Sequence, residues 1–158
     1  MEYRLRLHST HAEELKQHLF PGDGKEAIAF VLCGHHRSES LTLFCSHDIV
    51  LIPHDACKRH EDWITWPSEL SFPILDRAER ENLYFIKMHS HPSGYARFSE
   101  TDDTSDSEFF PFAYSWQNGR QIGGSAVMLP DGHVFARYVD AEGKFTPFEI
   151  ASTFPYVD

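Results

Sequence analysis

Apolar and charged residues alternate strictly over residues 3–7, a period of two that predicts a strand with one buried face. Apolar residues then recur with helical spacing over 12–20. Thr10 and Glu13 are spaced as a capping box at the start of this helix. The sequence Pro-Gly-Asp-Gly at 21–24 predicts its end, because proline and glycine do not continue a helix.

A continuous apolar run at 26–34 predicts a strand buried on both faces, with Glu26 as a charged residue at its start. The same patterns predict strands at 41–45, 49–52, 83–88, 122–129 and 133–139, and helices at about 73–82 and 99–110. Pro111 is expected to kink or end the last helix, because proline removes a backbone donor. Residues 53–67 and 145–158 show no clear period. We therefore expect one α/β domain over 1–158, with a mixed or mostly antiparallel sheet and about three helices.

The composition narrows the classes of partner. The chain has 14 Lys and Arg against 24 Asp and Glu, a formal charge of −10 that argues against nucleic acid as its main partner. No apolar run approaches the ~20 residues of a membrane span, and the N-terminal residues lack the apolar region of a secretory signal. We therefore expect a cytoplasmic protein that binds no membrane. Three cysteines without C-x-x-C spacing do not predict a disulfide framework.

The segment from His89 to Asp102 carries the strongest chemical signal. His89 and His91, separated by one residue at the end of a strand, project to the same side and could bind one ion. Pro92 and Gly94 then turn the chain, so that the helix that follows could return Asp102 to the same point. Two imidazoles and one carboxylate leave a fourth position for water, as in catalytic zinc sites, and this donor set suits zinc better than magnesium or calcium.

A zinc hydrolase also needs a general base, and Glu26 is the candidate. Ser99 could donate a hydrogen bond to the oxyanion of a tetrahedral intermediate. The pattern S-x-x-D is also typical of a helix cap, so Ser99 could have that role alone or in addition. Asp103 and Asp106 are alternatives to Asp102 as the metal ligand.

Glu26, followed far downstream by His89-Ser-His91-Pro, Ser99 and Asp102, resembles the JAMM (MPN, Mov34-type) motif of zinc metallopeptidases. The resemblance covers about residues 26–137 and is nearest to the small bacterial members. It implies a curved mixed sheet flanked by helices, similar to that of cytidine deaminases. It assigns zinc to His89, His91 and Asp102, the general base to Glu26, and support of the tetrahedral intermediate to Ser99.

The resemblance also implies a substrate class. Enzymes of this type hydrolyse peptide or isopeptide bonds, often at the C-terminus of ubiquitin or a ubiquitin-like protein. We therefore expect a deubiquitinase-like hydrolase, with a ubiquitin-like protein or its conjugate as substrate. Activating and conjugating enzymes of one bacterial pathway, such as an antiphage defence system, are the further partners implied. The alternatives are a peptidase that processes sulfur-carrier proteins, a small-molecule amidase, a DNA-repair-associated relative and a non-catalytic MPN scaffold.

Overall fold

The computed structural model describes residues 1–117, 120 and 123–154 of the 158. The strands are β1 (Glu2–His8), β2 (Ile28–Arg37), β3 (Leu41–Leu51), β4 (Lys58–Arg59), β5 (Ile64–Thr65), β6 (Tyr84–Ser90), β7 (Gly123–Met128), β8 (Val134–Val139), β9 (Phe145–Pro147) and β10 (Ile150–Phe154). The α-helices are α1 (Ser9–Leu19), α2 (Phe72–Arg80) and α3 (Glu100–Trp116), and 3₁₀ turns cover His54–Ala56 and Ser68–Ser71. Among these residues, no helix is long and apolar enough to cross a membrane.

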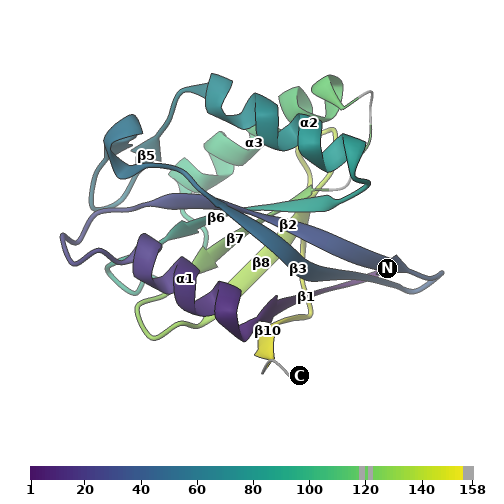
Figure 1. Cartoon of the computed structure of the whole chain (residues 1–158), viewed down its shortest axis with the longest axis horizontal. Helices are drawn as coiled ribbons and strands as arrows, with labels where there is room; N and C mark the ends of the chain where they lie inside the picture. Colours follow the sequence, from purple (N-terminus) through teal and green to yellow (C-terminus); the bar gives the residue numbers. More distant parts are fainter. Residues whose placement is uncertain (118–119, 121–122, 155–158) are drawn as a thin grey trace.

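Eight strands form one mixed sheet in the order β10-β1-β3-β2-β6-β7-β8-β9, and β4 and β5 form a separate hairpin. The sheet curls until its two halves meet (Figure 1). At that point the ring of Tyr3 in β1 stacks on Tyr138 in β8 at 4.7 Å, and the Glu149 backbone N–H donates to the Tyr3 carbonyl at 2.9 Å. Strand β6 lies near the middle of the sheet and is buried at every position, which makes its C-terminal end a rigid platform.

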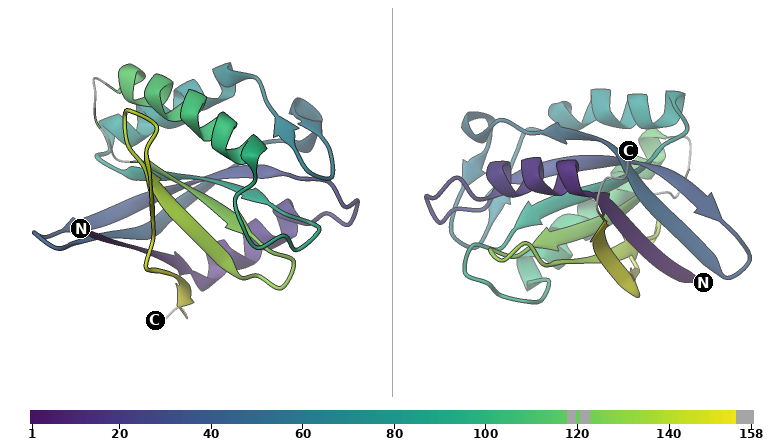
Figure 2. Two further views of the ribbon diagram at one scale, coloured as in Figure 1. Left: turned by 180° about the vertical axis from the view of Figure 1, so that it is seen from behind. Right: turned by 60° about the horizontal axis from the view of Figure 1, so that its bottom comes forward.

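Helices cover both faces of the sheet: α2 and α3 pack on one face and α1 on the other (Figures 1 and 2). The apolar run of β2 explains this arrangement, because successive strand side chains point to opposite faces. Ala29, Val31 and Cys33 contribute to the core under α1, whereas Phe30 and Leu32 contribute to the core under α2 and α3. The predicted mixed α/β fold with a curved sheet flanked by helices is confirmed.

Several element boundaries differ from those expected. Helix α1 begins at Ser9, and its cap is His8, whose side chain accepts from the Thr10 N–H at 3.2 Å. The capping box predicted from Thr10 and Glu13 is therefore wrong, because Thr10 already lies inside the helix. Strand β2 begins at Ile28, so Glu26 lies in the segment that precedes the strand.

Residues 41–52 were expected to form two strands, but 41–51 form the single strand β3. The polar residues in its middle have partners there. Ser46 accepts a hydrogen bond from the His8 backbone N–H at 2.8 Å, and Asp48 pairs with Arg77 at 2.7 Å. A register shift between Leu32 and Cys33 in β2 accommodates this length of pairing.

The C-terminal third holds two more differences. Helix α3 continues through Pro111 to Trp116, so this proline does not end it. The buried Phe110, Ala113 and Tyr114 hold the last turns on the sheet, and the Tyr114 hydroxyl donates to the Gly123 carbonyl at 2.9 Å. The tail, which showed no period, forms the short strands β9 and β10. Residue 122, the predicted start of the strand now seen as β7, lies outside the described residues, as do 155–158.

Candidate metal centre

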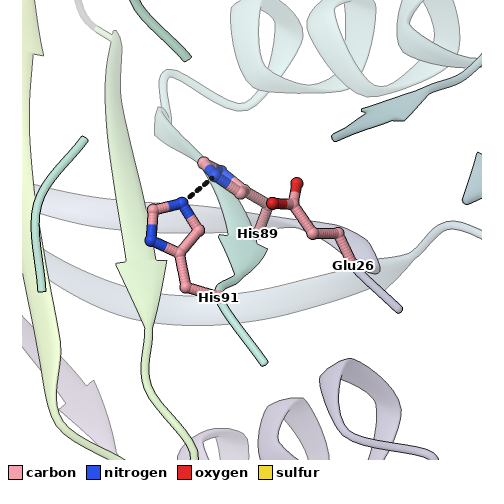
Figure 3. A group of neighbouring side chains, drawn as sticks. All are labelled: Glu26, His89 and His91. Carbon is pink, nitrogen blue, oxygen red and sulfur yellow. Dashed lines mark hydrogen bonds between the residues drawn. The ribbon is translucent and has the colours of Figure 1, made fainter. Parts of the chain in front are cut away.

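The end of β6 and the start of α3 bring the predicted site residues together. His89 is the last residue but one of β6, and His91 continues the strand by donating its backbone N–H to the Met128 carbonyl at 3.1 Å. Both side chains leave the sheet on the same side (Figure 3). Asp102 stands in the first turn of α3, where the loop after His91 returns the chain to the histidines.

His89, His91 and Asp102 are in direct contact. The Nε2 atoms of the two histidines lie 3.2 Å apart (Figure 3). Nε2 of His89 lies 2.9 Å from one carboxylate oxygen of Asp102, and Nε2 of His91 lies 2.9 Å from the other. All three residues are buried.

Glu26 completes the cluster. Its carboxylate lies beside His89 (Figure 3), and the ligand atoms of Glu26, His89 and His91 are all within 4.8 Å of one another. Its backbone is fixed on both sides, because its N–H donates to the His60 carbonyl at 2.8 Å and its carbonyl accepts from Arg59 Nε at 2.8 Å. The side chain is only 2% exposed. A carboxylate this buried is either hydrated by water held in the site or takes part in the chemistry there.

Ser90, the residue between the two histidines, ties the centre to the Glu26 segment. Its hydroxyl accepts from the Ala27 N–H at 3.0 Å, and its own N–H donates to the Ala27 carbonyl at 3.1 Å. Sequence reasoning did not single out this serine. The reciprocal pair sets the distance between the Glu26 backbone and the histidines.

The electrostatics of the two carboxylates differ. Burial raises the pKa of Glu26 to about 8, and the nearby negative charge of Asp102 adds to this effect. Burial also acts to raise the pKa of Asp102, but hydrogen bonds from His89, His91 and the Ser99 backbone outweigh it and hold that pKa well below its usual range. Two carboxylates with separated pKa values suit different roles, one that exchanges a proton and one that stays ionised.

The arrangement fits a bound metal cation. Nδ1 of His91 faces the Tyr95 carbonyl at 2.8 Å, so this nitrogen carries a proton and Nε2 is directed at a carboxylate oxygen of Asp102. Burial acts to lower the pKa of His91, but the hydrogen bond with Asp102 outweighs it and raises this pKa. The contact therefore holds a positive charge, which can be a proton on Nε2 or a metal cation in its place. Tetrahedral ligands at 2.0–2.1 Å from zinc are about 3.3 Å apart. The 2.9–3.2 Å separations of the three ligand atoms are close to that spacing.

Ser99 caps α3, as the S-x-x-D pattern predicts. Its hydroxyl accepts from the Asp102 N–H at 3.1 Å, and its own N–H donates to the Asp102 carboxylate at 2.8 Å. The capping box thus orients the proposed ligand Asp102. The hydroxyl acts as an acceptor in the cap, which leaves its proton free to donate to a group in the adjoining cavity.

Asp103 and Asp106, the alternative ligands, have other partners. Asp103 pairs with Arg137 at 2.7 Å. Asp106 pairs with Lys87 at 2.6 Å and with Arg137 at 2.8 Å, one helical turn beyond Asp102. Of the three aspartates, only Asp102 contacts both histidines among the described residues. Lys87, two residues before His89, is a buried residue near the site that sequence reasoning missed, and nothing in the local pattern distinguishes it from a surface lysine.

Cavities adjoin the centre on both sides. A void of about 20 Å³, room for about one water molecule, lies between Glu26, His89, Asp102 and Trp63. Next to it, a mostly apolar cavity of about 270 Å³ lies between β5 and α3. On the other side, a cavity of about 200 Å³ is lined by Glu26, His91 and Ser99, together with residues of the β4–β5 loop. The structure thus places residues 60–66, which showed no pattern in the sequence, against the centre.

Comparisons with known proteins identify the family and support the fold. The family model described as prokaryotic homologs of the JAB domain matches residues 8–133. The solution structure of protein DSY2949 from Desulfitobacterium hafniense is similar over 98% of this chain and 94% of that chain, with a TM-score of 0.58 and 12% identity. At that identity the similarity is one of fold alone. Among curated proteins, none matches the sequence significantly.

Proposed function

The chain belongs to the family of prokaryotic homologs of the JAB domain, which often has metal-dependent hydrolase activity, and on this premise we propose that it is a zinc-dependent peptidase. The observation that carries the proposal is the convergence of two histidine Nε2 atoms on the Asp102 carboxylate, with Glu26 beside them. Two imidazoles and a carboxylate are the donors of open, catalytic zinc sites.

His89, His91 and Asp102 would hold the zinc ion. When bound, zinc supplies Lewis-acid chemistry, acidifying water and polarising a carbonyl group. The rigid β6 end and the capping box fix the three ligands, so little reorganisation accompanies the reaction. The Tyr95 carbonyl keeps the His91 proton on Nδ1 and so directs the Nε2 lone pair to the centre.

Glu26 acts as the proton carrier. Its carboxylate has no hydrogen-bond or ion-pair partner among the described residues, and it lines the cavities on both sides of the centre. It takes a proton from the attacking water and transfers it to the leaving amine. The Ser99 hydroxyl donates a hydrogen bond to the oxygen that becomes negative when the carbonyl carbon turns tetrahedral.

The proposed substrate is the extended C-terminal tail of a ubiquitin-like protein, joined by a peptide or isopeptide bond to a second group. Strand β5 pairs only with β4 among the described strands, so its other edge can accept an extended peptide. The apolar cavity beside it, between Ile64, Trp66 and Phe112, would hold an apolar side chain of the tail. Conjugation enzymes of the same pathway are the partners that this substrate class implies.

The test is cleavage of ubiquitin-like fusions that carry a short extension after the C-terminal glycine. Wild type should release the extension. Glu26→Gln should fold and keep its zinc but lose at least about 10²-fold in kcat, the contribution of a general base. Glu69→Gln, an exposed charge change outside the site, serves as the matched control. Equal rates for Glu26→Gln and wild type would refute the assignment of Glu26, and an inactive wild type that binds zinc would indicate a non-catalytic scaffold.

A further inference from the structure

The cavity on the Ser99 side of the centre is acidic. It measures about 200 Å³, and Glu61 and Asp62 join Glu26 and His91 in its lining. No lysine or arginine lines it among the described residues. The cavity on the other side is more apolar: Ile64, Trp66, Phe109 and Phe112 line it, together with hydroxyl-bearing residues and one acidic residue, Glu108. The two sides of the scissile bond would therefore meet different chemistry.

Glu61 and Asp62 occupy the tip of the β4–β5 hairpin, and this tip is anchored. The His60 N–H donates to the Trp63 carbonyl at 3.0 Å, and the two rings stack at 3.7 Å. The His60 carbonyl accepts the backbone N–H of Glu26. The acidic pair is thus attached to the residue proposed as the general base, and its position relative to the centre is set by backbone contacts.

In the described part of the chain, His91 is the one basic side chain that lines this cavity, and it faces Asp102 of the metal centre. Arg59, the cation adjacent to the loop, uses its donors elsewhere: it binds Asp23 at 2.7 Å and the carbonyls of Lys25 and Glu26. Glu26, a residue only 2% exposed, also lines the cavity, and its carboxylate has no hydrogen-bond or ion-pair partner among the described residues. Glu26 and Asp102 together balance a divalent ion, so the charges of Glu61 and Asp62 remain for a ligand.

We propose that Glu61 and Asp62 form a subsite for a lysine or arginine side chain next to the scissile amide, on the leaving-group side of the substrate. The proposal rests on the peptidase function and specifies its substrate: an apolar tail on the β5–α3 side and a basic acceptor on the other. Glu61 and Asp62 are exposed, so this attraction should be strongest at low salt and should weaken as salt screens it.

The first experiment compares kcat/KM for three fusions that differ only in the residue after the scissile bond: Lys, Ala or Glu. Wild type should prefer Lys to Glu by about tenfold at low salt, with the ratio falling as salt screens the charges. In Glu61→Gln/Asp62→Asn the ratio should fall to about twofold. Glu39→Gln/Glu69→Gln, which removes two exposed charges elsewhere, should keep the wild-type ratio. An unchanged ratio in the first double variant overturns the proposal, as does a wild type without preference.

The second experiment does not depend on turnover. The amidated peptides Lys-Ala-Ala and Glu-Ala-Ala are titrated into wild type and both double variants, and binding is followed by the NMR shifts of the 61 and 62 amides. The Lys peptide should bind wild type at least about tenfold more tightly than it binds Glu61→Gln/Asp62→Asn. Selective binding without cleavage of any fusion would uphold the subsite and refute the peptidase function. Cleavage without selective binding would uphold the peptidase function and refute the subsite.

Discussion

Ser90 and Ala27 exchange two hydrogen bonds across the end of the sheet. The Ser90 hydroxyl accepts from the Ala27 N–H at 3.0 Å, and the Ser90 N–H donates to the Ala27 carbonyl at 3.1 Å. One partner separates the two histidines of the centre and the other follows Glu26 directly. The Ser90 hydroxyl is the side-chain part of this pair, and it helps to set the position of the proposed base relative to the proposed ligands.

Ser90→Ala should lower both stability and activity. The substitution leaves the buried Ala27 N–H without a partner, which costs about 1–3 kcal/mol in the free energy of unfolding. Urea unfolding measures this loss, and kcat on a cleavable fusion should fall while zinc content stays near one per chain. Ser40→Ala, the same change at an exposed position far from the centre in the fold, should alter stability by less. Equal effects of the two substitutions would contradict the role assigned to Ser90.

Ser99→Ala should separate the cap from the catalytic hydrogen bond. Loss of the cap costs about 1 kcal/mol of stability. Loss of the donor to the oxyanion should lower kcat by about 10²-fold with a smaller change in KM. Ser99→Thr keeps both the acceptor and the donor and should restore both quantities. A variant that loses stability but keeps kcat would show that Ser99 acts as a cap alone.

Asp106 should make the fold sensitive to acid. Burial acts to raise its pKa, but the charges of Lys87 and Arg137 outweigh burial and lower it. A carboxyl whose pKa is lower in the folded state stabilises the fold above its unfolded pKa of about 3.9, and this contribution is lost as pH falls through the folded pKa. Asp106→Asn should cost about 3–5 kcal/mol at pH 7, because buried Lys87 loses its carboxylate partner and Arg137 keeps only its pair with Asp103.

Urea unfolding between pH 7 and pH 3 checks this prediction. Below about pH 4, Asp106→Asn should lose stability less steeply than wild type, because it lacks one carboxyl whose pKa is lowered in the folded state. Asp76→Asn breaks only an exposed pair with Arg80 and should change stability by less than about 1 kcal/mol. If both variants follow the wild-type curve, the buried network does not govern acid stability.

Phe112→Ala should weaken substrate binding. The side chain lines the apolar cavity proposed for the tail, and loss of that contact should raise KM by about tenfold with kcat nearly unchanged. Trp116→Ala is the control, because this residue stacks on Phe72 outside the cavity lining. A similar KM for the two variants would place the tail elsewhere.

The sequence predicts the residues of the metal centre better than it predicts the strands, helices and loops around them. His89, His91, Ser99 and Asp102 lie within 14 residues, so their convergence depends on local signals: a strand end, a turn and a helix cap. Glu26 was a candidate as a charged residue ahead of an apolar strand, but no local signal predicts its distance from the histidines, which the β2–β6 pairing sets. The roles of the five residues stay predictions until the variants are measured.

The elements that were missed depend on distant partners. β3 remains one strand because Ser46 and Asp48 find partners on β1 and α2, which no local pattern encodes. Pro111 stays inside α3 because neighbouring buried aromatic side chains hold the helix on the sheet. Glu61 and Asp62 look like any solvated turn in the sequence, and only the fold places them at the centre.

Zinc content is the most direct test of the proposed metal centre. Wild type, Glu26→Gln and Asp102→Asn are purified identically, dialysed, and analysed for metal per chain. We expect about one zinc in wild type and in Glu26→Gln, and little in Asp102→Asn, since Asp102 is the proposed ligand and Glu26 the proposed base. Retention by Asp102→Asn with loss in Glu26→Gln would make Glu26 the ligand, and a wild type without zinc would contradict the metal centre itself.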